Sequence, residues 1–290
     1  MTIALALKVG DGLVLAADSA TTLMEGNIAY NWWFNAEKVF NVVKGLPIGV
    51  VTAGAASLGG RSINSLAKDL REQLTDPEHA RYLDPNTYTV QQVAERIKGF
   101  FFDELYLRDH ANKEPGKAPT IHFLVGGYCA HIREPEVWSV DVDNSQNCTV
   151  ACQLPPQLSG AGAWRGQGEA IDRILRGYST QLYEHMVALG ITPADAIRLL
   201  TTLPNPPLMH PGMPIQDVID LARYLLNATS DFVRFSPGPP TVHGPFDIAT
   251  ITPHEHFRWV QRKHFFDRRL NRPIDRYEQN SRNHGDAHVD

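Results

Sequence analysis

The chain of 290 residues contains only three cysteines, Cys129, Cys148 and Cys152. So few thiols, and an odd number of them, argue against a disulfide framework and indicate a reducing compartment. Cys148 and Cys152 are spaced as C-x3-C, but no second pair of ligands stands nearby in the sequence. We therefore expect a cytoplasmic protein that uses no metal and no cofactor.

The sequence also lacks a surplus of charge of one sign and any long apolar run. The 27 Lys and Arg residues and 32 Asp and Glu residues give a formal net charge of −5. This balance argues against nucleic acid or an anionic membrane surface as the main partner. No run reaches the length of a membrane span, and residues 2–9 lack the basic and long apolar segments of a secretory signal. We expect no membrane partner.

Short apolar stretches open the chain and predict an antiparallel sheet. Residues 3–9 and 13–17 flank Gly10-Asp11-Gly12, which favours a tight turn because glycine tolerates positive φ. Further strands are predicted at residues 38–43 and 48–53. Residues 20–36 are mixed and hold the cluster Trp32-Trp33-Phe34, which is interpreted either as a substrate surface or as a subunit contact.

Segments with apolar residues at helical spacing then alternate with segments whose composition is typical of strands. The remaining predicted elements are helices at 57–75 and 89–110, strands at 120–128 and 136–142, helices at 162–178 and 192–203, a loop at 205–214, a helix at 215–230 and a last strand at 246–252. No linker divides this apolar pattern. The order predicts one continuous layered α+β domain.

Thr2 follows Met1 directly, and a methionine before so small a residue is normally removed. Removal would leave a free amine and a hydroxyl on the same residue. An alcohol is a poor nucleophile until a base takes its proton, and an α-amine with a pKa of about 7.7–8.0 can serve as that base. Taken alone, Thr2 is more simply the second residue of an ordinary chain, so the proposal of a nucleophile depends on its neighbours.

Residues 2–22 (TIALALKVGDGLVLAADSATT) strongly resemble the start of mature proteasome β subunits. Gly12 and Ala16-Ala17-Asp18-Ser19 stand at the family spacing from Thr2, followed by Lys38 and by the small-residue segment 53–56. Weaker matches are LVGGY at 124–128 and the loop at 158–162. The resemblance implies an N-terminal-nucleophile hydrolase fold, a four-layer αββα sandwich, over residues 2–252. Residues 253–290 would then be a peripheral or partly disordered extension.

The resemblance also implies roles for individual residues. Thr2 would be the nucleophile, Lys38 would lower the pKa of its amine, and Asp18 would keep Lys38 charged and oriented. Gly54 would offer its backbone N–H to the oxyanion of the tetrahedral intermediate. Without the family spacing, Asp18 and Lys38 would be interpreted as a surface ion pair.

Supporting residues match the family less closely. Asp231 and Ser236 are the nearest candidates late in the chain, but their spacing departs from the family pattern. The family often has Ser between two glycines in its small-residue loop, whereas this chain has Ala161 there, preceded by Ser159. Ala20 stands where the family often has Arg. These departures put the efficiency of the chemistry in question more than the fold.

The function expected from the resemblance is a threonine-type endopeptidase that forms an acyl-enzyme on Thr2. Its substrates would be peptides or unfolded proteins, and its chains would assemble into a homo-oligomeric ring that an ATPase could feed. Two alternatives stay open. One is a ring scaffold with weak or no activity, and the other is an acylase of the same fold acting on small amides.

Overall fold

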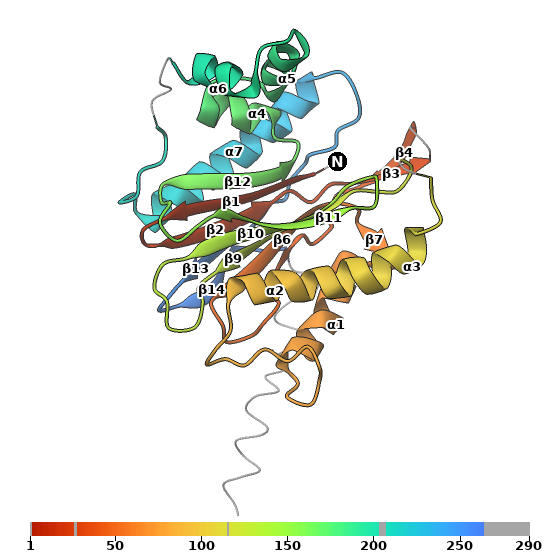
Figure 1. Cartoon of the computed structure of the whole chain (residues 1–290), viewed down its shortest axis with the longest axis vertical. Coiled ribbons are helices and arrows are strands. Elements are labelled where there is room, and N and C mark those ends of the chain that lie inside the picture. Colours follow the sequence, from red (N-terminus) through yellow and green to blue (C-terminus); the bar gives the residue numbers. More distant parts are fainter. Residues whose placement is uncertain (1, 26–27, 115, 203–206, 264–290) are drawn as a thin grey trace, which may run out of the picture.

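The computed structural model describes residues 2–25, 28–114, 116–202 and 207–263. Two five-stranded antiparallel sheets lie face to face, and helices cover the outer face of each (Figure 1). Apolar side chains from both sheets, among them Leu13, Leu15 and Leu124, fill the space between them. The predicted α+β class with mostly antiparallel sheets is confirmed.

The first sheet carries the N-terminal hairpin. Its order is β12 (Ala161–Gly166), β1 (Ile3–Val9), β2 (Gly12–Ala17), β13 (Asp247–Thr252) and β14 (His256–Gln261). Gly10 and Asp11 form the predicted turn, and Val9 pairs with Gly12. Every residue of β1 and β2 is buried because this central hairpin is covered on both faces.

The second sheet has the order β11 (Cys148–Leu154), β10 (Glu136–Val142), β9 (Ile121–Gly127), β6 (Ile48–Gly54) and β5 (Val39–Phe40). Two small hairpins lie outside the large sheets. They are β3 (Thr21–Glu25) with β4 (Ile28–Trp33), and β7 (Ser57–Leu58) with β8 (Arg61–Ser62). The first of these continues the chain directly beyond Asp18, at one end of the sandwich.

Helices α1 (Ile63–Thr75) and α2 (Val90–Ile97) cover the second sheet. Helix α2 continues through a π-helical stretch, η1 (Lys98–Tyr106), into α3 (Leu107–His110). Thr89 caps α2 as predicted, in a capping box with Gln92. The four residues predicted to line one face of the first helix, Ile63, Leu66, Leu70 and Leu74, are all buried against this sheet.

The other helices lie on the outer side of the first sheet. They are α4 (Glu169–Ile171), the π-helical η2 (Asp172–Arg176), α5 (Thr180–Ala188), α6 (Pro193–Thr201) and α7 (Ile215–Phe235). Of these, α7 lies against the strands of the sheet, and α5 and α6 lie farther out (Figure 1). Helix α7 packs against β1 and β2 through Val218, Ala222 and Leu225. Thr192 caps α6, with Pro193 in the first turn where its missing N–H is harmless.

Several predicted elements were wrong. The helix predicted at 57–75 begins only at Ile63. For residues 20–36 no element was predicted, and they contain the β3–β4 hairpin. The helix predicted at 162–178 begins instead with strand β12, which pairs with β1. Strand β11 and helix α5 were not predicted. The side chains of Ala161-Gly162-Ala163 are too small to show the alternation of a strand or the spacing of a helix. Only pairing with β1, which is distant in the sequence, decides that this segment is a strand.

The C-terminal boundary also changes. Residues 246–252 were predicted as the last strand, but β14 follows and pairs with β13 in the first sheet. The expected extension at 253–290 therefore begins with an integral strand, and residues 264–290 lie outside the described residues. Of the loop predicted at 205–214, residues 207–214 contain neither helix nor strand, and residues 205 and 206 lie outside the described residues.

Candidate active site

Three strand ends bring Thr2, Asp18 and Lys38 together. Thr2 precedes β1 and Asp18 follows β2, and the hairpin register pairs Ala4 with Ala17. Thr2 and Asp18 therefore lie at the same end of the hairpin. Lys38 immediately precedes β5 of the facing sheet, so its side chain reaches them across the space between the two sheets.

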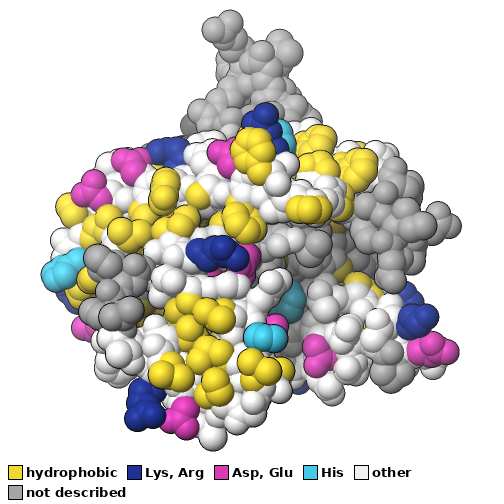
Figure 2. All heavy atoms as spheres, turned by 90° about the horizontal axis from the view of Figure 1, so that it is seen from above, with side chains coloured by type: hydrophobic (Ala, Val, Ile, Leu, Met, Phe, Trp, Pro, Cys, Tyr) yellow, Lys and Arg dark blue, Asp and Glu magenta, His cyan; other side chains and the backbone are white. Residues whose placement is uncertain are grey.

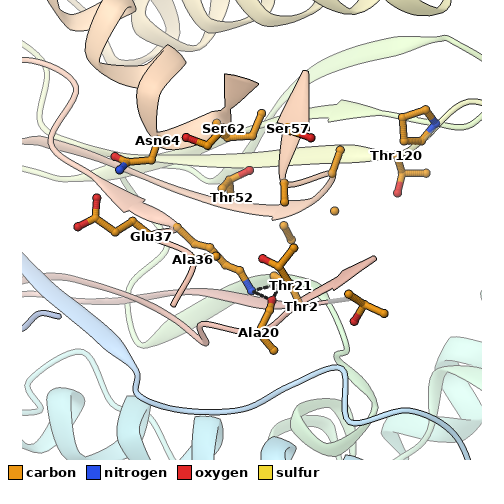
Figure 3. A pocket seen from close by; sticks show the side chains of 18 of the residues that line it. Thr2, Ala20, Thr21, Ala36, Glu37, Thr52, Ser57, Ser62, Asn64 and Thr120 are labelled. Atoms are coloured by element: carbon orange, nitrogen blue, oxygen red, sulfur yellow. Dashed lines mark hydrogen bonds between the residues drawn. The ribbon is translucent and has the colours of Figure 1, made fainter. Parts of the chain in front are cut away.

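The Lys38 ammonium connects these groups by three hydrogen bonds, and Figure 3 shows where Thr2 and Ala20 lie at the cavity. It donates to the Thr2 hydroxyl, to Asp18 Oδ1 at 2.7 Å and to the carbonyl oxygen of Ala20 at 2.5 Å. Thr2 and Lys38 are 3% and 6% exposed. A charged ammonium has three N–H donors, so this arrangement uses all of them and aims one at the hydroxyl.

Asp18 is fully buried, with acceptor contacts on both of its oxygens. Besides Lys38, Oδ1 accepts the N–H of Ile3 at 3.1 Å. The other oxygen, Oδ2, accepts the N–H of Ala20 at 2.8 Å and that of His243 at 3.3 Å. These backbone donors hold the carboxylate in one orientation, which in turn orients Lys38.

Burial sets the charge balance of Lys38. Removal of the ammonium from water lowers the pKa of Lys38 below its ordinary value of 10.5, and the charge and hydrogen bond of Asp18 oppose that decrease. Lys263 lowers the pKa of Lys38 further, and Asp247 raises it. The pair with Asp18 therefore favours the charged form at a site where burial disfavours it.

Thr2 and Lys38 line a cavity of about 630 Å³. Thr21, Thr52 and Glu37 bring polar groups to its wall, and small residues from 53 to 57 form another part of it (Figure 3). A cavity of this size, with a hydroxyl and an ammonium at its wall, can hold a side chain or a short segment of a substrate.

Gly54 lies on the same cavity, at the end of β6. The N–H of Thr52 donates to Lys38 O at 2.9 Å, and the N–H of Ala55 donates to Thr120 O at 2.9 Å on the opposite edge. Because N–H direction alternates along a strand, the Gly54 N–H points to the edge where Lys38 lies. Its φ of +94° favours glycine, and a Cβ there would lie 2.4 Å from Thr120 O.

The loop beside Thr2 is not the one predicted. The sequence placed the small-residue loop at 158–162, but Ser159 lies near the far end of β1, where the Gly160 N–H donates to Lys8 O. Gly166-Gln167-Gly168 occupies the Thr2 end instead, and the Gln167 N–H donates to Thr2 O at 2.7 Å. The residue between two glycines beside Thr2 is therefore Gln167, not Ala161. The sequence did contain a signal for this alternative, because the G-x-G pattern occurs at residues 160–162 and again at residues 166–168.

Asp231 and Ser236 do not join the site. Both lie at the C-terminal end of α7 and line a second cavity together with Arg173. Asp231 is exposed, and the Ser236 hydroxyl donates to Phe232 O at 2.6 Å. Of the predicted residues, the structure thus brings together Thr2, Asp18, Lys38 and Gly54. Asp247 and Lys263, which also lie near Lys38, carried no motif that could have identified them.

Comparison of the chain with protein-family models and with curated proteins finds no match. Within the part of the chain that the structure describes, no helix has the length and apolar character needed to cross a membrane. Across the same residues, no three His, Cys, Asp or Glu side chains are grouped so that they could hold a metal ion.

Proposed function

We propose that this protein is a threonine-type peptidase of the N-terminal-nucleophile class, similar to proteasome β subunits, whose nucleophile is Thr2 after loss of Met1. One observation carries the proposal. The Lys38 ammonium donates hydrogen bonds to both the Thr2 hydroxyl and the buried Asp18 carboxylate, beside a cavity that Gly54 also lines. A hydroxyl with a buried cation aimed at it is the arrangement that favours an alkoxide.

The proposed reaction begins with the base. Loss of Met1 converts the Thr2 nitrogen from an amide into an amine, which can accept a proton near neutral pH. The positive charge of Lys38 keeps that amine unprotonated, so it is ready to take the proton of the Thr2 hydroxyl. Thr2 Oγ1 then attacks the carbonyl carbon of the peptide bond.

Gly54 provides the next element. Its N–H would donate to the oxyanion that forms as the carbonyl carbon becomes tetrahedral. The protonated Thr2 amine gives its proton to the leaving nitrogen, and the C–N bond breaks to leave an ester on Thr2. Water, deprotonated by the same amine, then attacks the ester, which releases the acid and restores the Thr2 hydroxyl.

The proposal includes assembly into a homo-oligomeric ring that encloses the sites. Exposed apolar side chains at the C-terminal ends of α5 and α7 support it, with Leu189 at 70% and Phe235 at 79% exposure. Figure 2 views the molecule from the side of these helices and shows hydrophobic side chains gathered on its surface. Surfaces of this kind favour association, because burying them removes apolar area from water. A ring of this type could receive unfolded substrates from an ATPase.

The test combines mass measurement with covalent labelling. Intact-mass analysis of purified protein should show a chain that begins at Thr2. A peptide epoxyketone should add to the N-terminal residue. Formation of the cyclic adduct requires a hydroxyl and a free amine on the same residue. Peptide mapping would locate the adduct, and fluorogenic peptides would measure hydrolysis in the same preparation.

Two variants provide matched controls. Thr2→Ala still permits loss of Met1 but has no hydroxyl, so it should keep the oligomer and lose labelling and hydrolysis. Thr2→Ser keeps both groups and should retain part of the reaction. Correctly processed, assembled protein that forms no adduct and cleaves neither peptides nor small amides would favour the scaffold. Cleavage of small amides alone would favour the acylase.

A further inference from the structure

A second buried lysine lies close to the proposed catalytic lysine. Lys263, just after β14, donates from its ammonium to Asp247 Oδ2 at 2.6 Å and to Ala36 O at 2.9 Å, and it also donates to the Ser19 hydroxyl. Its side chain is 7% exposed, and that of Asp247 is 1% exposed. Both charges are therefore removed from water and depend on each other.

The partners of Lys263 adjoin the residues of the site. Ser19 follows Asp18 in the chain, and Ala36 lies two residues before Lys38. The Ala36 N–H donates to Ser19 O at 3.0 Å, so the two segments are also bonded to each other. Lys263 thus holds the segment that carries Asp18 against the segment that carries Lys38.

A third segment joins the same network. The Ser19 N–H donates to His243 O at 3.0 Å, and the Ser19 hydroxyl donates to Pro245 O. The N–H of Lys263 donates to Asp247 Oδ1 at 3.1 Å, which fixes the end of β14 to the start of β13. The N–H of His243 in turn donates to Asp18, so the network ends on the carboxylate that orients Lys38.

We propose that Lys263, anchored by Asp247, is a positioning residue that holds the Asp18 and Lys38 segments together and tunes the charge of Lys38. Its ammonium bonds to Ser19, Ala36 and Asp247 and not to Thr2, so it acts on the site through Ser19 and through Ala36, which lines the cavity. For its kinetic effect the inference rests on the proposed function. The structural part, an effect on Lys38, does not.

Electrostatics supports this assignment independently of the hydrogen bonds. Burial lowers the pKa of Lys38, the charge and hydrogen bond of Asp18 raise it, the charge of Lys263 lowers it and the charge of Asp247 raises it. These are the charged groups that act on Lys38 from β2, β13 and the end of β14. Removal of Lys263 should therefore raise the pKa of Lys38, and removal of Asp247 as well should give a lower pKa than removal of Lys263 alone.

The experiment compares three variants with the wild type. Lys263→Met leaves Asp247 buried without its cation and could fail to fold, so Lys263→Met/Asp247→Asn is made beside it. Lys8→Met is the matched control. Lys8 is also a buried lysine, bonded to the carbonyl oxygens of Pro155 and Pro156 near the opposite end of β1 from Thr2.

Two readouts are taken on the full-length protein. The first is the pKa of Lys38, measured by NMR with lysine labelled at Cε and assigned with Lys38→Arg. The second is kcat and KM for a fluorogenic peptide, or the rate of epoxyketone labelling, as a function of pH. Melting temperatures confirm which variants are folded.

The proposal expects the pKa of Lys38 to be higher in Lys263→Met than in the wild type and higher in Lys263→Met than in the double variant, with no change in Lys8→Met. It expects kcat to fall about tenfold to a hundredfold in the folded Lys263 variants, with KM nearly unchanged. This is the effect of displacing groups that act in the chemical step. The proposal is overturned if the pKa of Lys38 is the same in the wild type and in both folded Lys263 variants. It is also overturned if both folded Lys263 variants keep the wild-type kcat across the pH range. Should the wild type itself be inactive, the proposed function fails, and the pKa comparison still decides the role of Lys263.

Discussion

Lys38, 36 positions away in the chain, donates a hydrogen bond from its ammonium to the hydroxyl of Thr2. Both side chains are almost completely buried, although they lie just before strands of different sheets. A cation held against an alcohol in this way has a chemical consequence, because it stabilises the deprotonated oxygen more strongly than it would in water.

Lys38→Met should remove most of the activity with a limited effect on the fold. The thioether side chain fills similar space without the charge, while Asp18 keeps its three backbone N–H donors. We expect hydrolysis to fall on the order of a hundredfold to ten-thousandfold. Lys38→Arg should also be poor, because a planar guanidinium cannot replace a compact ammonium in this space. Lys8→Met, which removes a buried lysine elsewhere, should keep near-normal rates.

Asp18→Asn should move the alkaline limit of activity to lower pH. Burial lowers the pKa of Lys38, and the carboxylate of Asp18 opposes this, so loss of its charge should lower the pKa further. If the charged lysine is needed, the rate will decline at lower pH than in the wild type. A pH profile of kcat measures the shift, and a limb that moves to higher pH would contradict the assignment.

The same pKa makes a prediction about stability. The folded pKa of Lys38 lies below its ordinary value of 10.5, so the native state binds this proton more weakly than the unfolded chain does. Below its folded pKa, Lys38 therefore lowers the free energy of unfolding. This penalty becomes smaller as pH rises from the folded pKa toward the ordinary value. Urea unfolding across alkaline pH should show this rise in the wild type and lose it in Lys38→Met.

Gly54→Ala should impair catalysis by displacing the proposed oxyanion donor. The Cβ would lie 2.4 Å from Thr120 O at a residue with φ of +94°, so the end of β6 would have to move. We expect a loss of about a hundredfold, which a displacement of roughly 1 Å can produce. Gly45→Ala is the control, because Gly45 has φ of +85° and open space around its Cβ position. Equal rates in the two variants would refute the role of Gly54.

Gly166→Ala should disturb the loop that holds the Thr2 carbonyl. The new Cβ would lie 1.9 Å from Thr2 O, which no side-chain rotation can relieve. The free energy of unfolding should fall by more than the roughly 1–2 kcal/mol expected from positive φ alone. Gly45→Ala again measures the φ effect by itself. Thermal and urea unfolding of both variants would test the difference.

Asp141→Asn should lower stability near neutral pH and reduce its loss in acid. Burial alone would raise the pKa of Asp141, but hydrogen bonds from Arg165 and His122 hold it well below its ordinary value of 3.8. A depressed carboxyl pKa contributes stability above 3.8 that is lost as pH falls toward the folded pKa. The difference between wild type and variant should shrink in that range. Asp220→Asn, on an exposed helix face, should show little difference at either pH.

Much of the site could be predicted because its parts are local. The turn Gly10-Asp11-Gly12 fixes the register of β1 and β2, and that register leaves Thr2 and Asp18 at one end. The pattern of apolar residues in a strand and the residue preferences of a tight turn extend over only a few residues. Both can therefore be read from a single sequence. Lys38 and Gly54 were identified from family spacing, since nothing local distinguishes them from a surface lysine and a turn glycine.

What only the tertiary structure decided is which distant segments lie beside that end. Residues 158–162 and 166–168 are both small-residue segments, and the pairing of Ile3 with Gly166 places the second one beside Thr2. Lys263 contacts Ser19 across 244 positions of sequence. Such contacts come from sheet pairing and packing, whose partners are chosen by the whole fold. A sequence pattern records how a residue fits its immediate neighbours, and it carries no comparable trace of a partner two hundred residues away.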